Sequence, residues 1–204
     1  GGGPAPTFSS SKLLERLASR RMDGEFQGEL AEAWKAAADF KSYAIKIRKG
    51  VKFHDGKDMT ADDVVYSIDE IWKKHAAAAS LTDVARLLSR PGTVEQMLAA
   101  PDADTVVVSF SKPVPEFFFS SLLCGPVNYI VPRHVYAGSD PARNPANDAP
   151  VGTGPWTFKQ WVRGSHFEYA RNDAYWRQDT PYLDRLIIQT IPDAAGRVLL
   201  TRIA

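Results

Sequence analysis

Residues 30–72 read LAEAWKAAADFKSYAIKIRKGVKFHDGKDMTADDVVYSIDEIW, and this stretch decides the fold. Apolar and polar side chains alternate over residues 43–47, which predicts a strand that is buried on one face. The His-Asp-Gly sequence at residues 54–56 is typical of a turn. Thr60, followed three residues later by Asp63, predicts the start of a helix. Behind that start lies an apolar stripe at helical spacing: Val64, Val65, Ile68, Ile71 and Trp72.

Composition narrows the class of protein. The chain has 204 residues, 44% hydrophobic and 24% charged, as in an ordinary globular protein with one large or two small domains. Its formal net charge of +1 argues against a nucleic-acid-binding protein, which would usually carry a basic excess. No run of 18 apolar residues is present, so no transmembrane helix is predicted. The single cysteine, Cys124, excludes an internal disulfide.

Four sequence motifs resemble one known family. LAEAW at residues 30–34 and IKIRKGVKFHDGKDMTADDVVYSI at residues 45–68 resemble the signature of the family 5 extracytoplasmic solute-binding proteins of peptide and nickel ABC transporters. Ala33 stands where that family usually has serine. GTGPW at residues 152–156 and RNDAYW at residues 171–176 resemble two further motifs of the family. The resemblance extends from about residue 10 to about residue 200.

The resemblance implies a mixed α+β and α/β fold. It predicts a lobe like that of type II periplasmic binding proteins, a mixed sheet flanked by helices with a small inserted α+β subdomain. Residues 1–29 and 150–204 are expected to form parts of the first main lobe, and residues 30–149 the inserted subdomain. A second ligand-binding lobe is expected to be missing from this chain. The first residues, GGGPAPTF, lack a signal peptide, so the sequence is expected to begin after an export signal.

The remaining elements follow from local patterns. Ser10 or Ser11 is expected to cap a helix that carries Leu13, Leu14 and Leu17 on one side. Residues 94–98 fit either an edge strand or a short helix that starts at Thr93. The other expected elements are a helix over residues 81–88, a strand over 105–110, a buried short helix containing Phe117, Phe118, Phe119, Leu122 and Leu123, a short helix near His134, two strands around 158–161 and 167–169, a strand over 186–191 and a final helix over 192–200.

No catalytic, metal or cofactor site is predicted. The four histidines, His54, His75, His134 and His166, lack the spacing of metal ligands. His54 is expected to pack on its own hairpin, and Asp55 to fix the turn before Gly56. The Gly-Thr-Gly sequence at residues 152–154 lacks the rest of a phosphate loop, and the next residue, a proline, has no backbone donor. We therefore interpret it as an unusual backbone at the start of a strand. No GxSxG motif is present, and Cys124 is interpreted as an inert thiol.

The resemblance supplies the candidates for ligand contact. In the family, the segment that returns from the small subdomain lines part of the cleft, which nominates Cys124, Asn128 and Tyr129. The Asn128 amide is suited to hydrogen bonding with peptide groups, and a role in a turn is an equal alternative. The five tryptophans are expected to be mostly core residues, and the resemblance places Trp34 and Trp176 at structural positions.

The predicted function is capture of a peptide-like or other small solute outside the cytoplasmic membrane, for delivery to an ABC transporter permease. The expected partners are the solute and the permease, with no nucleic acid, and with membrane contact only through the permease or a missing anchor. We expect this chain alone to bind the solute weakly or not at all. A ligand-sensing regulatory domain of the same fold, fused to a DNA-binding helix-turn-helix, is the alternative. An enzyme is a third possibility that no motif supports.

Overall fold

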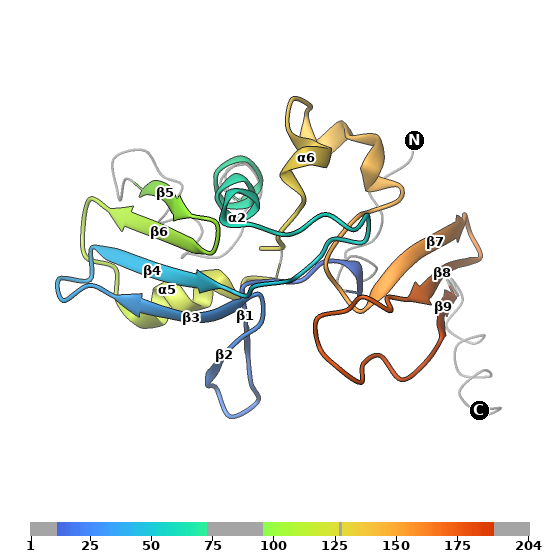
Figure 1. Cartoon of the computed structure of the whole chain (residues 1–204), viewed down its shortest axis with the longest axis horizontal. Coiled ribbons are helices and arrows are strands. Elements are labelled where there is room, and N and C mark those ends of the chain that lie inside the picture. The colour runs from blue at the N-terminus through green and yellow to red at the C-terminus, as the bar shows by residue number, and fades with distance from the viewer. Residues whose placement is uncertain (1–11, 73–95, 127, 190–204) are drawn as a thin grey trace.

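The computed structural model describes residues 12–72, 96–126 and 128–189. Figure 1 shows a four-stranded sheet with its helices at one end of an elongated molecule and a three-stranded sheet at the other. Segments that cross between the two ends lie at the centre, around the short strands β1 (Ala18–Arg20) and β2 (Phe26–Gly28). This mixed α+β arrangement agrees with the predicted fold class.

The four-stranded sheet has the antiparallel order β3-β4-β6-β5. Its strands are β3 (Ala31–Ala36), β4 (Ser42–Ile47), β5 (Gln96–Asp102) and β6 (Thr105–Phe110). On β4, Tyr43, Ile45 and Ile47 are buried while Ala44 and Lys46 are exposed, which confirms the predicted alternation. The strand β5 also settles the open choice for residues 94–98 in favour of a strand, from Gln96 onward.

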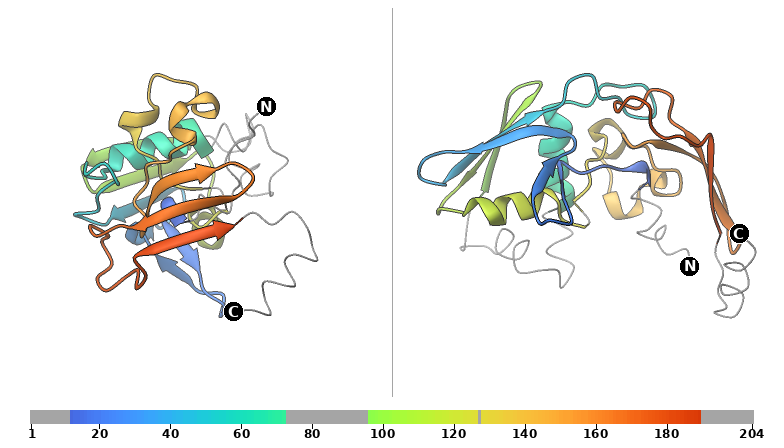
Figure 2. Two further views of the ribbon diagram at one scale, coloured as in Figure 1. Left: turned by 90° about the vertical axis from the view of Figure 1, so that its right-hand side faces the viewer. Right: turned by 90° about the horizontal axis from the view of Figure 1, so that it is seen from below.

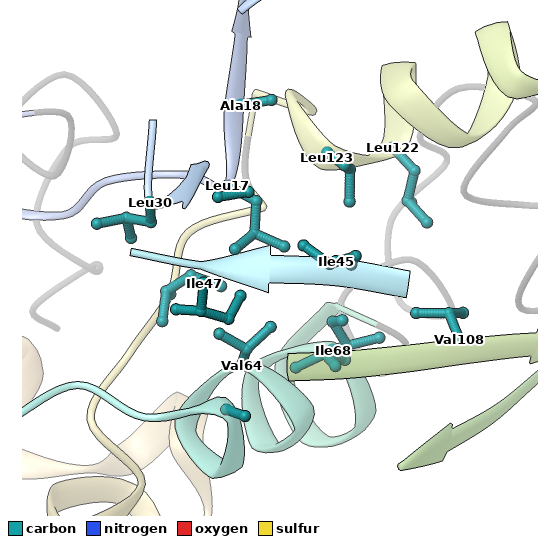
Figure 3. Close-up of a cluster of buried hydrophobic side chains, with 14 of the residues drawn as sticks. Leu17, Ala18, Leu30, Ile45, Ile47, Val64, Ile68, Val108, Leu122 and Leu123 are labelled. Carbon is teal, nitrogen blue, oxygen red and sulfur yellow. The ribbon is translucent and has the colours of Figure 1, made fainter. Parts of the chain in front are cut away.

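Both long helical segments cover the same face of this sheet. The α-helix α2 (Ala61–Tyr66) continues directly into the π-helical turn η1 (Ser67–Trp72), and α5 spans Glu116–Leu123. Figure 3 shows the side chains of Val64 and Ile68 from the first helix and of Leu122 and Leu123 from α5 gathered around Ile45 and Ile47 of β4. The predicted helix start is confirmed, because the Asp63 carboxylate accepts the backbone N–H of Thr60 at 2.9 Å.

The helix α5 is only half buried, which corrects the prediction for its aromatic run. Phe119 is fully buried and stacks on Tyr43 with 3.8 Å between ring centroids, but Phe117 and Phe118 are 53% and 43% exposed. Successive helical residues are turned by about 100° from one another, so three in a row cannot all face the sheet. Phe117 and Phe118 therefore contribute an exposed apolar surface.

The predicted helix over Leu13, Leu14 and Leu17 is wrong for the described residues. Only Lys12 and Leu13 are helical, and the chain then runs extended into β1, which pairs antiparallel with β2. Contacts with distant segments explain this conformation. The carbonyl oxygens of Leu13 and Glu15 accept hydrogen bonds from Gly154 and Ile130, both at 2.9 Å, instead of from the next helical turn. Tertiary pairing thus overrides the local helical pattern.

The second sheet has the antiparallel order β7-β8-β9, with β7 (Trp156–Val162), β8 (His166–Arg171) and β9 (Arg185–Gln189). These strands confirm the three predicted for this region, as far as residue 189. Between the sheets lie α6 (Arg133–Tyr136), at the predicted position near His134, and the 3-10 turns η2 (Pro141–Arg143) and η3 (Pro145–Asn147). The expected helices over residues 81–88 and 192–200, and the proposed caps Ser10 and Ser11, lie outside the described residues.

The buried apolar residues form two clusters. The larger one extends along the chain from Leu17 to Ile130, and the smaller one joins Leu13 to Trp156, Phe167 and Tyr169 of the second sheet. The predicted subdomain boundaries at residues 29/30 and 149/150 stay a prediction, and Leu17 already packs in the larger cluster. Within the described ranges, no helix is both long and apolar enough to cross a membrane.

Candidate ligand-binding site

Three segments that are far apart in sequence meet between the two sheets. Residues 13–17 lie against Cys124, Tyr129 and Ile130 on one side and against residues 152–176 on the other. Figure 2 shows the two sheets at opposite ends of the molecule, with β1 at the centre. We call this meeting point the crossover site and define it by Glu15, Arg16, Cys124, Tyr129 and Trp176.

Glu15 joins the N-terminal segment to the loop that precedes β7 and to the loop between β8 and β9. One carboxylate oxygen accepts the Thr153 hydroxyl and the Trp176 indole N–H, both at 2.9 Å, and the other accepts the Tyr175 hydroxyl at 2.7 Å. The side chain is buried. Burial raises the pKa of Glu15, although the hydrogen bonds from Tyr175, Trp176 and Thr153 act in the opposite direction. The carboxylate is therefore an internal connection of the protein and is not open to a ligand.

The Gly-Thr-Gly sequence at residues 152–154 permits this close packing. A Cβ atom at Gly152 would lie 2.0 Å from the carbonyl oxygen of Leu13, and one at Gly154 would lie 2.7 Å from that of Lys12. The Gly154 N–H donates to the Leu13 carbonyl oxygen at 2.9 Å. The two glycines thus let backbone meet backbone, which agrees with the interpretation of the motif as an unusual backbone rather than a phosphate loop.

His54, at the start of the turn over residues 54–56, contacts the backbone of the same Gly-Thr-Gly sequence. His54 Nε2 lies 3.0 Å from the Gly154 carbonyl oxygen, and His54 Nδ1 accepts the Gly152 N–H at 3.2 Å. Burial lowers the pKa of His54, despite the opposite effects of Gly154 and Asp55. Because Nδ1 accepts an N–H and Nε2 faces a carbonyl oxygen, this geometry fits the neutral imidazole with its proton on Nε2. The ring bridges to Gly152 and Gly154 instead of packing on its own hairpin as expected.

Asp55 fixes the turn as predicted and also makes a longer-range contact. Its carboxylate accepts the Lys57 backbone N–H at 3.2 Å and lies 2.6 Å from His134 Nε2. Burial acts to raise the pKa of Asp55, but the bonds from His134 and Lys57 outweigh it, so the pKa of Asp55 is lowered. No group of three or more His, Cys, Asp or Glu side chains in the described part of the chain is arranged to hold a metal ion.

Arg16 carries the positive charge of the crossover site. Its guanidinium donates to the Cys124 carbonyl oxygen at 3.1 Å and lies 5.5 Å from the centroid of the Tyr129 ring. Backbone pairing of Arg16 with Tyr129 sets this position. Within the described residues, no carboxylate lies at ion-pair distance from Arg16, and the residue is only half buried. The remaining N–H groups of the guanidinium can bind an anionic group.

The three residues nominated from sequence occupy different environments. Cys124 directly follows α5 and is half buried. Burial raises the pKa of its thiol, and the opposing effect of the Arg16 charge is smaller. Asn128 is buried, and its side-chain amide donates to the Leu122 carbonyl oxygen at 2.7 Å. This bond gives Asn128 a structural role in the turn that follows α5. Tyr129 is half buried and faces Arg16. The structure brings Cys124 and Tyr129 together around Arg16, and ligand contact by all three stays a prediction.

Trp176 is enclosed by cationic groups. The guanidinium carbons of Arg48 and Arg177 lie 4.3 Å and 4.6 Å from its ring centroid. An open hollow of 730 Å³ lies along the loop that contains Trp176, from Arg171 to Tyr182, and Tyr175 and Arg177 form part of its wall. Trp176 therefore has a structural position, as the resemblance implied, at the margin of a polar hollow.

Sequence reasoning missed Glu15 and Arg16. The signal was the pair of charged residues inside the apolar run Leu13, Leu14, Leu17, which fits a solvent-exposed helix face equally well. Thr153, the partner of Glu15, is 138 positions away in sequence. Only the folded chain makes that pairing visible.

Comparison with known proteins agrees with the fold. The family described as "Bacterial extracellular solute-binding proteins, family 5 Middle" matches residues 25–202. The chain is 32% identical over 175 residues to the oligopeptide-binding protein AppA of Bacillus subtilis, covering 83% of this chain and 30% of that protein. It is 29% identical over 206 residues to the dipeptide-binding protein of Escherichia coli, covering 93% of this chain and 37% of the relative. The chain thus spans about a third of the length of these curated relatives.

Solved structures give the same result. The structure of Bacillus subtilis AppA in complex with a nonapeptide aligns with a TM-score of 0.75 and 26% identity, over 100% of this chain and 39% of that one. AgaA of A. tumefaciens R10, in complex with agropinic acid, aligns with a TM-score of 0.79 and 28% identity, over 96% of this chain and 37% of that one. Because the family match extends over residues 25–202 and the fold agrees over most of the chain, this chain belongs to the family 5 extracellular solute-binding proteins of bacteria.

Proposed function

We propose that this chain is one lobe of a non-enzymatic, extracytoplasmic solute-binding protein that captures a peptide or similar small solute for an ABC transporter permease. The observation that carries the proposal is the half-buried Arg16, which has no carboxylate at ion-pair distance among the described residues. A peptide carries a terminal carboxylate, and a guanidinium binds carboxylates through paired N–H donors. Relatives that bind oligopeptides and dipeptides support the choice of solute class.

The proposed mechanism is capture between two lobes. The solute first contacts the crossover site, where Arg16 holds its carboxylate and Tyr129 and Cys124 form the adjacent surface. A second lobe, supplied by further sequence of the kind that the longer relatives have, then closes over it. The solute favours the closed state because it contacts both lobes only there. The buried network around Glu15 keeps the first lobe rigid during closure.

The test is a thermal unfolding screen of this chain and of the longer protein that contains it, against peptides, sugars, nickel and haem. Binding to the folded state raises the free energy of unfolding by about 2.7 kcal/mol at a ligand concentration of 100 times Kd. We expect a peptide without lysine or arginine to stabilise the longer protein and not this chain alone. Equal stabilisation of both would place the whole site in this chain and refute the two-lobe mechanism.

A pair of arginine variants tests the role of Arg16 in the longer protein. Arg16→Gln removes a charge-assisted hydrogen bond that is worth about 1.5–3 kcal/mol, so we expect peptide affinity to fall about 10- to 150-fold. Arg163→Gln is the control, since Arg163 lies in the turn after β7, is exposed, and sits over the ring of Trp161. Unchanged peptide affinity in Arg16→Gln would remove the observation on which the proposal rests.

A further inference from the structure

A second concave surface lies on the four-stranded sheet, at the outer edge of β3. It is a hollow of 610 Å³ whose wall includes Ala33 and Trp34 of β3 and Phe117 of α5. Trp34 lies opposite Ile45 and so points to the helix-covered face, while Ala33 lies opposite Lys46 and points to the other face. Ala33 and Trp34 point to opposite faces of the sheet, so a hollow that both of them line must lie along the edge of the strand. We call it the β3-edge hollow.

At the start of this edge the Ala31 N–H already donates to the carbonyl oxygen of Leu17, at 3.0 Å, whereas residues 33–36 have no strand on their outer side in the described part of the chain. β3 is the terminal strand of the sheet order, paired only with β4, and Figure 1 shows it at the lower margin of the sheet. Alternate backbone N–H and C=O groups of a terminal strand point outward, where another extended chain can pair with them. Docking of an extended segment on such an edge is a common mode of peptide recognition.

The side chains around the hollow are acidic and aromatic. Its wall includes Glu25, Glu32 and Glu116, and none of these carboxylates has an ion-pair partner among the described residues. Phe26 and Phe117 meet edge to face, with 5.7 Å between ring centroids. This combination favours a positively charged group next to an apolar one.

Arg20 shows that the aromatic pair accepts a cation. Its guanidinium carbon lies 5.6 Å from the Phe26 ring centroid and 5.5 Å from that of Phe117. Phe117 is 53% exposed, so its ring offers further surface to a second cation from outside. Arg20 thus makes, within the chain, the same kind of cation–aromatic contact that we expect a basic side chain of a partner to make.

From these observations we propose that the β3-edge hollow binds an extended, lysine- or arginine-containing segment of a partner protein, which pairs with the backbone of β3. This surface differs from the crossover site. Phe117 lies in the first turn of α5, and Cys124, at the other end, is ~10 Å farther along the helix axis at 1.5 Å per residue. The proposal does not depend on the solute, and it supplies an interaction surface on the four-stranded sheet that the proposed capture mechanism does not use.

Fluorescence anisotropy with short labelled peptides tests the proposal on this chain. The probe is the acetylated and amidated peptide Lys-Val-Lys-Val-Lys, compared with Glu-Val-Glu-Val-Glu and Lys-Pro-Lys-Pro-Lys. We expect the first to bind, the second not to bind, and the third to bind at least tenfold more weakly, because proline cannot donate to a strand ladder. Equal binding of the two lysine peptides would mean diffuse charge attraction and would overturn strand pairing.

Variants locate the bound peptide. The double change Glu32→Gln and Glu116→Gln should weaken binding about two- to thirtyfold, since each exposed ion pair is worth about 0.2–1 kcal/mol. Met97→Ser is the matched control, because Met97 is 72% exposed on β5, the terminal strand at the opposite edge of the sheet. An affinity loss in Arg16→Gln instead of the glutamate variant would place the peptide at the crossover site and overturn the proposal.

Hydrogen exchange gives a readout that needs no variant. With the lysine peptide at saturation, amides of residues 33–36 should exchange more slowly, while those of residues 97–100 on β5 should not change. Unchanged exchange over residues 33–36 under saturation would refute pairing with β3, whatever the anisotropy shows.

Discussion

Replacing Glu15 by leucine should destabilise the chain far more than replacing it by glutamine. Leucine leaves three buried or half-buried donors without their acceptor: the Thr153 hydroxyl, the Tyr175 hydroxyl and the Trp176 indole N–H. Each hydrogen bond to a charged acceptor is worth about 1.5–3 kcal/mol, and the apolar side chain offsets part of the loss. We expect Glu15→Leu to lower the free energy of unfolding by about 3–5 kcal/mol.

Glutamine can satisfy the same donors. Its amide oxygen can take the place of the carboxylate oxygen that accepts from Thr153 and Trp176. Its NH₂ group can then donate to the Tyr175 hydroxyl oxygen, whose proton rotates away. Glu15→Gln should therefore cost less than about 1.5 kcal/mol near neutral pH.

The pH dependence of the two proteins should differ in a set direction. Burial raises the pKa of Glu15 above its usual 4.5, so the folded chain holds this proton more tightly than the unfolded chain does. The part of the stability that comes from this tighter proton binding is therefore full below about pH 4.5 and is lost as the pH rises through the folded-state pKa. Glutamine does not titrate, so the variant has no such loss. For the parent, each tenfold difference between the acid constants of Glu15 in the folded and the unfolded chain is worth about 1.4 kcal/mol. The free energy of unfolding of Glu15→Gln should therefore increase relative to that of the parent chain as the pH rises.

Urea unfolding followed by tryptophan fluorescence and circular dichroism, at pH 4.5 and 7.5, measures these differences. The reasoning is refuted if Glu15→Leu unfolds within about 1 kcal/mol of the parent, or if glutamine is as damaging as leucine. The reasoning about burial is refuted if the difference between parent and Glu15→Gln stays constant over this pH range.

Two further predictions concern the residues that hold the Gly-Thr-Gly sequence. Gly152→Ala places a methyl group 2.0 Å from the Leu13 carbonyl oxygen, so the backbone must shift; we expect a loss of about 1–3 kcal/mol in urea unfolding, and a loss under about 0.5 kcal/mol would contradict the contact. Burial lowers the pKa of His54, so its contribution to stability should be full above about pH 6.5 and be lost as the pH falls through the folded-state pKa. Thermal unfolding from pH 7.5 to 5 should show this loss in the parent and a flatter profile in His54→Gln; parallel profiles would contradict it.

The sequence by itself determined the elements whose signal is local. Alternation over residues 43–47 predicted the buried strand β4, and Thr60 with Asp63 predicted the start of α2, because both depend on neighbours within a few positions. The motifs of residues 30–68, 152–156 and 171–176 also indicated the family before any contact was known, and the family match confirms it.

Tertiary structure decided the rest, because contacts between distant residues have no local pattern. The run Leu13, Leu14, Leu17 has helical spacing, yet Gly154 and Ile130 take its carbonyl groups and hold it extended. Glu15 finds its donors about 140 to 160 residues later in the chain, so its role as the centre of the crossover site could not be predicted from its neighbours. Phe117 is part of an apolar run that predicted burial, but the direction of α5 against the sheet leaves this ring exposed at the β3-edge hollow. A pattern of hydrophobicity predicts which residues favour the interior, and only the packing of whole elements decides which of them reach it.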